Sequence, residues 1–421
     1  MKLQLPAIIL ALVTAAAAGN GYFYREYWAD FDKAVSNHAD GRWRVNDPEL
    51  SLHPVFGKRP EARANGLMLI DLDQDLFALD GVCLYLEMWG GHPDTADKRF
   101  FVNGRGPYPI DSFGTESNHC TYSYPLVELN TSHLVRGINA FQFACERGDG
   151  FWGHFIIDNA ALRCRLAPDH PDIASCGLDY FAPKVRLSTP VDAVADQTQL
   201  WLDGLPAAAT DIVRVDYFAR YEGFDDNGDL IENDWHGFTH RKKPVNHICT
   251  STASPYRVAW DTSLIPSQKT SMAVKAVVTM QNGLLYETEI TDRLSFPARR
   301  PTVSMFKCDP LPAPFWSRAS REKTALITLP ADLSGAVRAR LQVKVWDGGQ
   351  GKTARPFTIN GRPYNILSGR AVHDVVYTDI EIALSDLLPG PNTLKLLSDT
   401  DHHGIEILLP GPCLTLRFNK D

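Results

Sequence analysis

One stretch of this sequence is written twice, and this repetition constrains the fold more than any other feature. The first copy, EMWGGHPDTADKRFFVNGRGPY, runs from Glu87 to Tyr108, and the second, KVWDGGQGKTARPFTINGRPY, runs from Lys344 to Tyr364. Each copy contains a Trp, a Gly pair, a Thr, a Phe and then Asn-Gly-Arg, and the interval from the Trp to the Asn is the same in both. The repetition predicts two structurally equivalent segments.

The match continues beyond these segments. The run YPLVELNTSHLVRGIN, which ends at Asn139, aligns without a gap with YTDIEIALSDLLPGPN, which ends at Asn392. Both copies then finish on an apolar run typical of a strand. We therefore expect one unit to occur twice, over 62–167 and over 318–421.

Strand signals dominate the repeated unit. VCLYLEMW in the first copy and ARLQVKVW in the second alternate side-chain type with period two, as half-buried strands do. Asn103-Gly104 and Asn360-Gly361 follow such runs and suit tight hairpins, because both central positions of a type I′ turn need φ > 0. Short strands, frequent turns and almost no helical periodicity predict an all-β protein in which both repeats are jelly-roll-like β-sandwiches.

The repeated unit resembles galactose-binding-like β-sandwich domains. The resemblance rests on the strand that ends at the Trp, on the Asn-Gly hairpin, on the stretch from Asn139 to Phe143 and on Ile157-Asp158-Asn159. It covers about half of the chain and implies a fold shared with many carbohydrate-binding modules, without naming a sugar. The second copy departs from the pattern, since Pro410-Gly411-Pro412 stands where the first has Asp158-Asn159.

The residues between the copies have a different character. Strand-like runs such as DIVRVDYFARYEGF and SMAVKAVVTMQNGLLYETEI resemble immunoglobulin- or fibronectin-like modules of extracellular proteins. The expected architecture is therefore two jelly-roll-like sandwiches flanking a central immunoglobulin-like sandwich over 178–300. The Pro-rich stretch 301–317 is predicted to be a stiff linker.

The N-terminus has the pattern of an export signal. Lys2 precedes LQLPAIILALVTAAAA, an apolar run that ends in small residues, which predicts a signal peptide over 1–18. Residues 19–61 then form an N-terminal extension that we expect to pack against a sandwich. No later run is long and apolar enough to span a membrane, so the mature protein is expected to be secreted.

The eight cysteines fit an oxidising compartment. None forms a Cys-x-x-Cys pair, and an even count predicts disulfides, with 120–145 and 164–176 as the preferred pairs among many possible ones. Asn130-Thr131-Ser132 is a sequon and predicts a surface glycosylation site at Asn130.

The overall charge excludes a nucleic-acid partner. The formal net charge is −8 and the pI is near 5.9, whereas nucleic-acid surfaces need clustered Lys and Arg. The only basic run, Arg241-Lys242-Lys243, is interpreted as a solvated loop.

The repeated Trp-Gly-Gly phrase supplies the candidate ligand-binding residues. Sugars stack on aromatic rings while polar side chains bond their hydroxyls, and loops at strand ends are usual places for such groups. The alternative interpretation is structural, with the Trp filling a core and the Gly pair allowing a bend. The candidates are Trp89, His92, Arg105, His119, Trp346, Asp347, Arg362 and His373.

The segment GFDDNGDLIENDWHGFTHRKK, from Gly223 to Lys243, is rich in oxygen ligands. Asp225, Asn227 and Asp229 are spaced like the first three calcium ligands of an EF-hand. The positions that an EF-hand gives to Gly and Glu hold Leu230 and His236, so any calcium loop here would be of another kind. A plain hairpin tip with solvated charges is the alternative.

The same segment holds the candidate catalytic residues. Two of Asp229, Glu232 and Asp234 could act as the carboxylate pair of a glycoside hydrolase. His236 and His240 could instead abstract a proton in a polysaccharide lyase. Acidic loops without catalytic function are the common alternative.

The sequence favours a secreted carbohydrate- or cell-surface-binding protein without catalysis. A secreted carbohydrate-active enzyme with its site between the sandwiches is the first alternative, and an exported biosynthetic catalyst or a structural extracellular protein is the second. A cleft between the two copies lined by His, Tyr, Arg and carboxylates would favour the enzyme, whereas an exposed flat row of Trp and Tyr would favour binding.

Overall fold

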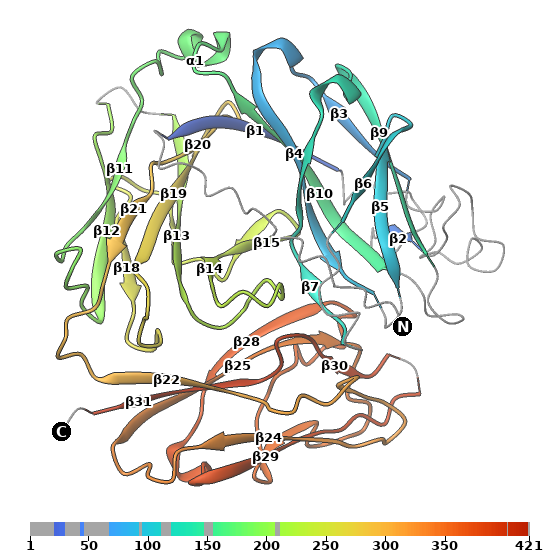
Figure 1. The fold of residues 1–421 in the computed structure, drawn as a ribbon, viewed down its shortest axis with the longest axis vertical. Helices are drawn as coiled ribbons and strands as arrows, with labels where there is room; N and C mark the ends of the chain where they lie inside the picture. Colours follow the sequence, from blue (N-terminus) through green and yellow to red (C-terminus); the bar gives the residue numbers. More distant parts are fainter. Residues whose placement is uncertain are drawn as a thin grey trace, which may run out of the picture.

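The structure is a computed structural model in which three β-sandwiches pack together, with the C-terminal one lying below the other two in Figure 1. It describes residues 21–29, 43–45, 67–91, 95–110, 119–146, 155–206, 211–401 and 403–419. The expected all-β class is confirmed. The predicted signal peptide and most of the N-terminal extension lie outside the described residues, as does His92.

The first sandwich consists of two facing sheets. One has the strand order β3-β9-β5-β6, and in the other β4 lies between β10 and the short strands β7 and β8. Phe100, Phe141 and Leu162 are fully buried between them. The strands are β3 (Leu67–Leu72), β4 (Leu79–Trp89), β5 (Ala96–Val102), β6 (Arg105–Pro109), β7 (Tyr122–Ser123), β8 (Leu126–Leu129), β9 (Gly137–Glu146) and β10 (Phe155–Leu166), with 3-10 turns η3 (Leu76–Ala78) and η5 (Thr131–His133).

The C-terminal sandwich has the strand order β24-β29-β26-β27 in one sheet and β22-β31-β25-β30-β23 in the other, with β28 beside β25. The prediction of a linker over 301–317 is wrong for its first half, because 302–307 forms a strand that pairs with β31. The elements are β22 (Thr302–Lys307), β23 (Trp316–Ser317), β24 (Lys323–Leu329), β25 (Ala336–Asp347), β26 (Phe357–Ile359), β27 (Arg362–Pro363), β28 (Val375–Glu381), η7 (Leu384–Asp386), β29 (Gly390–Leu396), β30 (Ile405–Ile407) and β31 (Cys413–Phe418).

The two outer sandwiches share a buried asparagine network. In the first, the Asn139 amide donates to the carbonyls of Val135 and Gly137 and accepts from the Val135 N–H and from Asn103. In the second, Asn392 makes the corresponding bonds to Leu388, Gly390 and Asn360. These bonds satisfy the backbone of the turn before the strand, which explains why both copies keep an Asn there. Gene duplication remains a prediction, which the shared strand order and this network support.

The central sandwich places the sheet β11-β12-β18 against the sheet that contains β13 and β19. Val215, Val274 and Val278 are fully buried in its core. Its elements are α1 (Pro171–Ser175), β11 (Lys184–Leu187), β12 (Gln197–Asp203), β13 (Ile212–Glu222), β14 (Asn233–His236), β15 (Phe238–His240), β16 (Lys243–Val245), β17 (Cys249–Ser251), β18 (Val258–Asp261), β19 (Met272–Met280), β20 (Leu285–Glu287) and β21 (Thr291–Leu294).

The strand β1 (Tyr22–Trp28) joins the first and central sandwiches. It pairs with β10 on one side and β20 on the other, which completes a 12-stranded sheet. Phe23 enters the central core, and Tyr27 packs against the core of the first sandwich. The short strand β2 (Trp43–Val45) also pairs with β10.

The preferred disulfide pairs are not formed, and none of the eight cysteines, each within a described range, takes part in a disulfide. The thiol of Cys145 lies 3.6 Å from the Val45 carbonyl oxygen inside the first sandwich, whereas Cys120 is buried where the first and C-terminal sandwiches meet. Cys164 is fully buried and Cys176 is exposed. Among the described residues, no helix has the length and hydropathy needed to span a membrane.

Candidate functional site

The two Trp residues of the repeated phrase contact each other. The ring centroids of Trp89 and Trp346 are 6.2 Å apart, and both side chains belong to a small apolar cluster separate from the core of either sandwich. Tyr124 and Tyr377, which also align in the repeat, share a hydrogen bond between their hydroxyls. The two outer sandwiches thus meet through equivalent positions, and the Trp residues fill this interface rather than a sugar site.

The Gly pairs that follow each Trp are needed for close backbone approach. A Cβ on Gly90 would lie 2.4 Å from the Thr121 hydroxyl, and one on Gly348 would lie 2.4 Å from the carbonyl oxygen of Gly404. Gly91 and Gly349 have φ values of 103° and 109°, which L side chains rarely adopt. These contacts support the structural interpretation of the repeated phrase.

The remaining ligand-binding candidates separate into two groups. Asp347 is buried and accepts a hydrogen bond from the Ser368 N–H, while the exposed His373 ring lies 4.9 Å from that of His403. His119 is half-buried, and burial lowers its pKa. Asp347 ends β25, whereas His119 and His373 lie in loops; all three are near the contact between the outer sandwiches.

Arg105 and Arg362 begin β6 and β27 and do not lie in the loops that follow the Trp residues. Arg105 donates to the Ser132 carbonyl, and Arg362 lies 3.7 Å from Asp386. The strand β5 separates Arg105 from the loop after Trp89 by roughly 20 Å, at about 3.3 Å per residue. Both arginines are exposed and support turns instead of a common site.

The acidic segment of the central sandwich is inserted between the two outer ones (Figure 1). The carboxylate of Glu87, fully buried in β4, accepts hydrogen bonds from the Thr239 hydroxyl and from the N–H groups of Arg241 and Lys242. On the other side, Asp374 accepts from the Arg241 guanidinium at 2.7 Å. Arg241 and Lys242 thus dock this segment onto its neighbours, while Arg241 and Lys243 remain exposed, as the interpretation of a solvated loop expects.

His240 takes part in the same junction, which contradicts a role as an accessible catalytic base. Its Nε2 lies 3.1 Å from an Asp374 carboxylate oxygen, and Asp374 is itself buried.

The Lys344 ammonium, fully buried in β25, donates to the carbonyls of Tyr122 and Asp226. Burial lowers the pKa of Lys344 to about 8, because the charged form loses its hydration.

The calcium interpretation of the acidic loop is not supported. Both carboxylate oxygens of Asp225 accept hydrogen bonds from the N–H groups of Gly228, Asp229 and Leu230. The Asn227 amide donates to Asp229 and to Asp234. No group of three or more His, Cys, Asp or Glu side chains in the described part of the chain could hold a metal ion. The loop is therefore held by hydrogen bonds that occupy the proposed ligands.

The three carboxylates proposed as a catalytic pair serve the same loop. Asp229 accepts from the Ile231 N–H, and burial raises its pKa to about 6. Asp234 accepts from the Trp235 N–H, and Glu232 forms an ion pair with Lys307. None of the three lines either cavity described below, so the structure gives no support to a hydrolase pair among them.

A cleft of 340 Å³ opens between the central and C-terminal sandwiches. Aromatic side chains on its lining include Tyr221, Trp260 and Tyr377. Asp226 is held by His236, whose Nδ1 lies 2.8 Å from the carboxylate and whose ring stacks on Tyr221. Of the sequence candidates, only His236 lies in this cleft. Its other polar lining residues include Asn246, His247, Asp261, Arg340, Gln342 and Asp379.

An ion pair spans the C-terminal side of the cleft. Arg340 lies 3.2 Å from Asp379, on adjacent strands β25 and β28. Burial raises the pKa of Asp379, and the negative charges of Asp226 and Glu381 act in the same direction against the guanidinium of Arg340. Sequence reasoning missed Asp226 and Asp379 as a site, because only the packing of two sandwiches brings them to one cleft.

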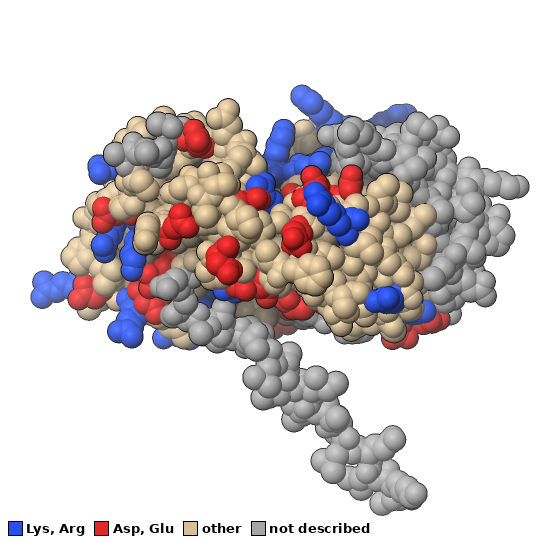
Figure 2. Space-filling model, turned by 90° about the horizontal axis from the view of Figure 1, so that it is seen from above, with Lys and Arg blue, Asp and Glu red and all other residues tan. Residues whose placement is uncertain are grey.

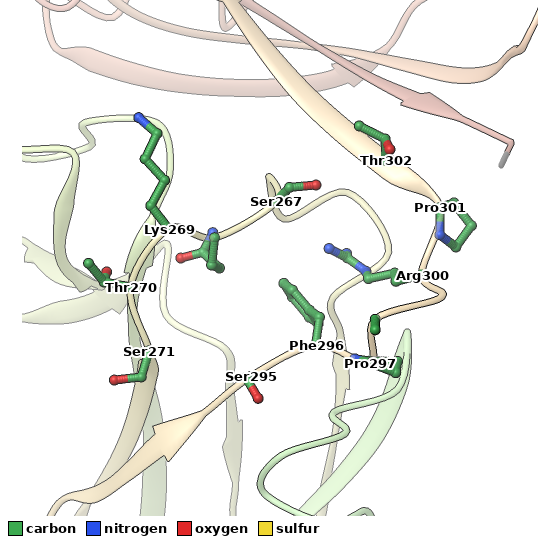
Figure 3. Close-up of a pocket in the computed structure, with 12 residues that line it drawn as sticks. Ser267, Lys269, Thr270, Ser271, Ser295, Phe296, Pro297, Arg300, Pro301 and Thr302 are labelled. Atoms are coloured by element: carbon green, nitrogen blue, oxygen red, sulfur yellow. The ribbon is translucent and has the colours of Figure 1, made fainter.

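A second hollow, of 480 Å³, lies between the central sandwich and the start of β22. Figure 3 shows Arg300 beside the ring of Phe296, with the guanidinium carbon 3.5 Å from the ring centroid. Arg300 also donates to the carbonyls of Thr262 and Ile265, so its donors serve the fold. The other side chains are mostly hydroxyls and prolines, which do not form a defined site.

The charged side chains give no basic patch on the face that Figure 2 shows. Lys and Arg are interspersed there with Asp and Glu. This distribution agrees with the acidic net charge and offers no continuous track for a phosphate backbone on that face.

No family model and no curated protein matches this chain. One similar solved structure is a β-porphyranase of glycoside hydrolase family 86 from the human gut bacterium Bacteroides plebeius, with 12% identity and a TM-score of 0.25; the match covers 56% of this chain and 36% of that one. A second is the fibronectin(III)-like modules of Clostridium thermocellum CbhA, with 13% identity and a TM-score of 0.17, covering 52% and 98%. A third is an exo-beta-1,3-galactanase from Phanerochaete chrysosporium, with 9% identity and a TM-score of 0.17, covering 84% and 78%. The chain thus spans only about a third of the porphyranase, and likenesses this low assign neither family nor activity.

Proposed function

We propose that this protein binds a carbohydrate in the cleft between the central and C-terminal sandwiches. The observation that carries the proposal is the lining, which combines aromatic rings, among them the half-buried Tyr221 and Tyr377, with planar hydrogen-bonding groups such as Arg340 and Asn246. Sugars present apolar faces to rings and hydroxyls to such groups, so this mixture suits them. The volume of 340 Å³ is at the lower end of the range for small-ligand pockets, which fits one or two sugar rings.

A calorimetric screen of oligosaccharides tests this proposal. Arg340→Gln removes a guanidinium from the cleft and is expected to weaken binding about tenfold or more. Arg186→Gln is the matched control, because Arg186 lies on β11 outside the cleft, where it pairs with Asp203 on β12. Equal losses in both variants, or no loss in either, would place the sugar elsewhere.

Glycoside hydrolysis is the second candidate, favoured by one observation. Asp226 and Asp379 line the same cleft, and burial raises the pKa of Asp379, as a general acid requires. Release of reducing ends from polysaccharides would then be lost in Asp379→Asn. Glu232→Gln, which removes a carboxylate outside the cleft, should leave it unchanged. Binding without any turnover would support the first candidate alone.

Two features outside the cleft remain proposals as well. Secretion rests on the pattern of residues 1–18, and glycosylation on the sequon at Asn130. Asn130 is exposed, and its side-chain oxygen caps η5 by accepting from the Ser132 N–H at 3.0 Å. Expression in a glycosylating host with Asn130→Gln as the control tests both, through the mass of the protein in the medium.

A further inference from the structure

We infer that the cleft selects a saccharide bearing free amino groups over one bearing carboxylates. This inference rests on the proposed carbohydrate function of the same cleft and adds the chemical class of the ligand. It starts from the charges that line the cleft, where the carboxylates of Asp226, Asp261 and Asp379 face a single guanidinium, that of Arg340.

Both terminal nitrogens of this guanidinium already contact groups of the protein. Besides its ion pair with Asp379, Arg340 donates to the Leu264 carbonyl at 3.2 Å and to the Gln342 side chain at 3.3 Å. A uronate entering the cleft would have to compete with Asp379 for this group while approaching two further carboxylates. Like charges placed together across an interface disfavour such a ligand.

The two histidines of the cleft do not reverse this balance. Burial lowers the pKa of His247, which favours its neutral form. His236 lies between two groups of the protein, with Nδ1 at 2.8 Å from the Asp226 carboxylate and Nε2 at 3.1 Å from the Tyr221 carbonyl oxygen, so both ring nitrogens are engaged by these neighbours. Neither ring therefore offers a free positive charge to an anionic sugar.

Asp379 is the carboxylate best placed to receive an amine. Its side chain is 52% exposed, whereas that of Asp226 is only 11% exposed and is bonded to His236. An ammonium group beside Asp379 would gain a charge-assisted hydrogen bond. The half-buried rings of Tyr221 and Tyr377 on the same lining favour a cation further, because the face of an aromatic ring is negative.

The test compares three hexasaccharides on the full chain: glucosamine, N-acetylglucosamine and galacturonic acid. Calorimetry at pH 6, where primary amines are protonated, should show glucosamine binding about tenfold more tightly than its acetylated form, with no binding of the uronate. Raising the salt concentration should shrink this preference, because the charges at the mouth of the cleft are screened.

Variants of Asp379 test whether this residue causes the preference for the amino sugar. Asp379→Asn should reduce it to less than about threefold, and Asp379→Glu should retain it. Asp292→Asn is the matched control, since Asp292 is an exposed carboxylate on β21 outside the cleft. Circular dichroism melts of all three variants should match that of the natural chain.

The outcomes of this test distinguish a failure of the amine preference from a failure of the proposed carbohydrate binding. Equal binding of the glucosamine and N-acetylglucosamine hexamers, or tighter binding of the uronate, overturns the amine preference and leaves carbohydrate binding standing. A preference that survives Asp379→Asn overturns the assignment to this cleft. Absence of binding by every saccharide in this test and in the wider screen overturns both.

Discussion

Trp89 packs against Trp346, its counterpart in the repeat, with ring centroids 6.2 Å apart. The contact joins the ends of β4 and β25, the strands that carry the repeated phrase in each copy. Interfaces between copies of one unit are commonly built from the same patch on both sides. The phrase is thus written twice in a protein whose two outer sandwiches use it to contact each other.

Replacing Trp89 with Ala should destabilise the protein by about 3–5 kcal/mol, because it empties a buried volume at this interface. Urea unfolding followed by circular dichroism measures the change. Trp201→Ala is the control, since Trp201 is half-buried on β12, and it should cost less than half as much. If the two variants lose similar free energies of unfolding, the Trp89 interface contributes little to stability.

Lys344 makes stability depend on pH in a defined direction. Its pKa in the folded chain is about 8, below the usual lysine value of 10.5, so the unfolded chain binds more protons between these values. This group therefore raises stability as pH rises from 8 to 10.5, by up to about 3 kcal/mol at 1.36 kcal/mol per unit. Urea unfolding of the natural chain and of Lys344→Met at pH 7.5 and pH 10 isolates the effect. If both chains respond alike, Lys344 is not the source.

The carboxylate of Glu87 holds the inserted segment through hydrogen bonds from Thr239, Arg241 and Lys242. Glu87→Gln replaces one acceptor oxygen by a donor that faces N–H groups, which should destabilise the protein by about 2–4 kcal/mol. Hydrogen exchange of residues 239–242 should accelerate before that of β13. Glu128→Gln, which alters an exposed carboxylate on β8, provides the comparison and should leave this exchange unchanged.

The buried asparagines of the outer sandwiches should behave alike. Asn139→Ala and Asn392→Ala each leave backbone groups of the preceding turn unpaired and should each cost about 2–4 kcal/mol. Chemical denaturation gives the totals, and hydrogen exchange should show faster exchange only in the sandwich that carries the change. Strongly unequal losses would contradict the equivalence of the two networks.

Local patterns predicted the sandwiches but not their arrangement. Period-two alternation in VCLYLEMW and the Asn-Gly turns identified strands and hairpins, because these depend on neighbouring residues. The contacts of Glu87 with 239–242 depend on how separate sandwiches dock, which no local pattern records. The same limit explains why the sequence did not predict Asp226 and Asp379 as a pair in one cleft. The catalytic carboxylates that it did predict all belong to the loop segment beside the cleft.

The cysteines show a second limit of sequence reasoning. An even count and an export signal made disulfides the expectation, but pairing needs side chains on one face at short range. Cys83 and Cys164 lie on paired strands, yet Cys83 stands opposite Arg163 and Cys164 opposite Val82, so adjacent positions turn them to different faces.

The position of β1 has a consequence for synthesis of the chain. This strand emerges among the first residues of the described chain, yet one of its two partners, β20, lies at Leu285–Glu287. Until the ribosome has passed that point, the flank of β1 that β20 will cover remains open to strands of other chains. The nascent protein therefore exposes an aggregation-prone strand edge through most of its translation. Cells that express it at a high level would benefit from chaperones that cover this edge.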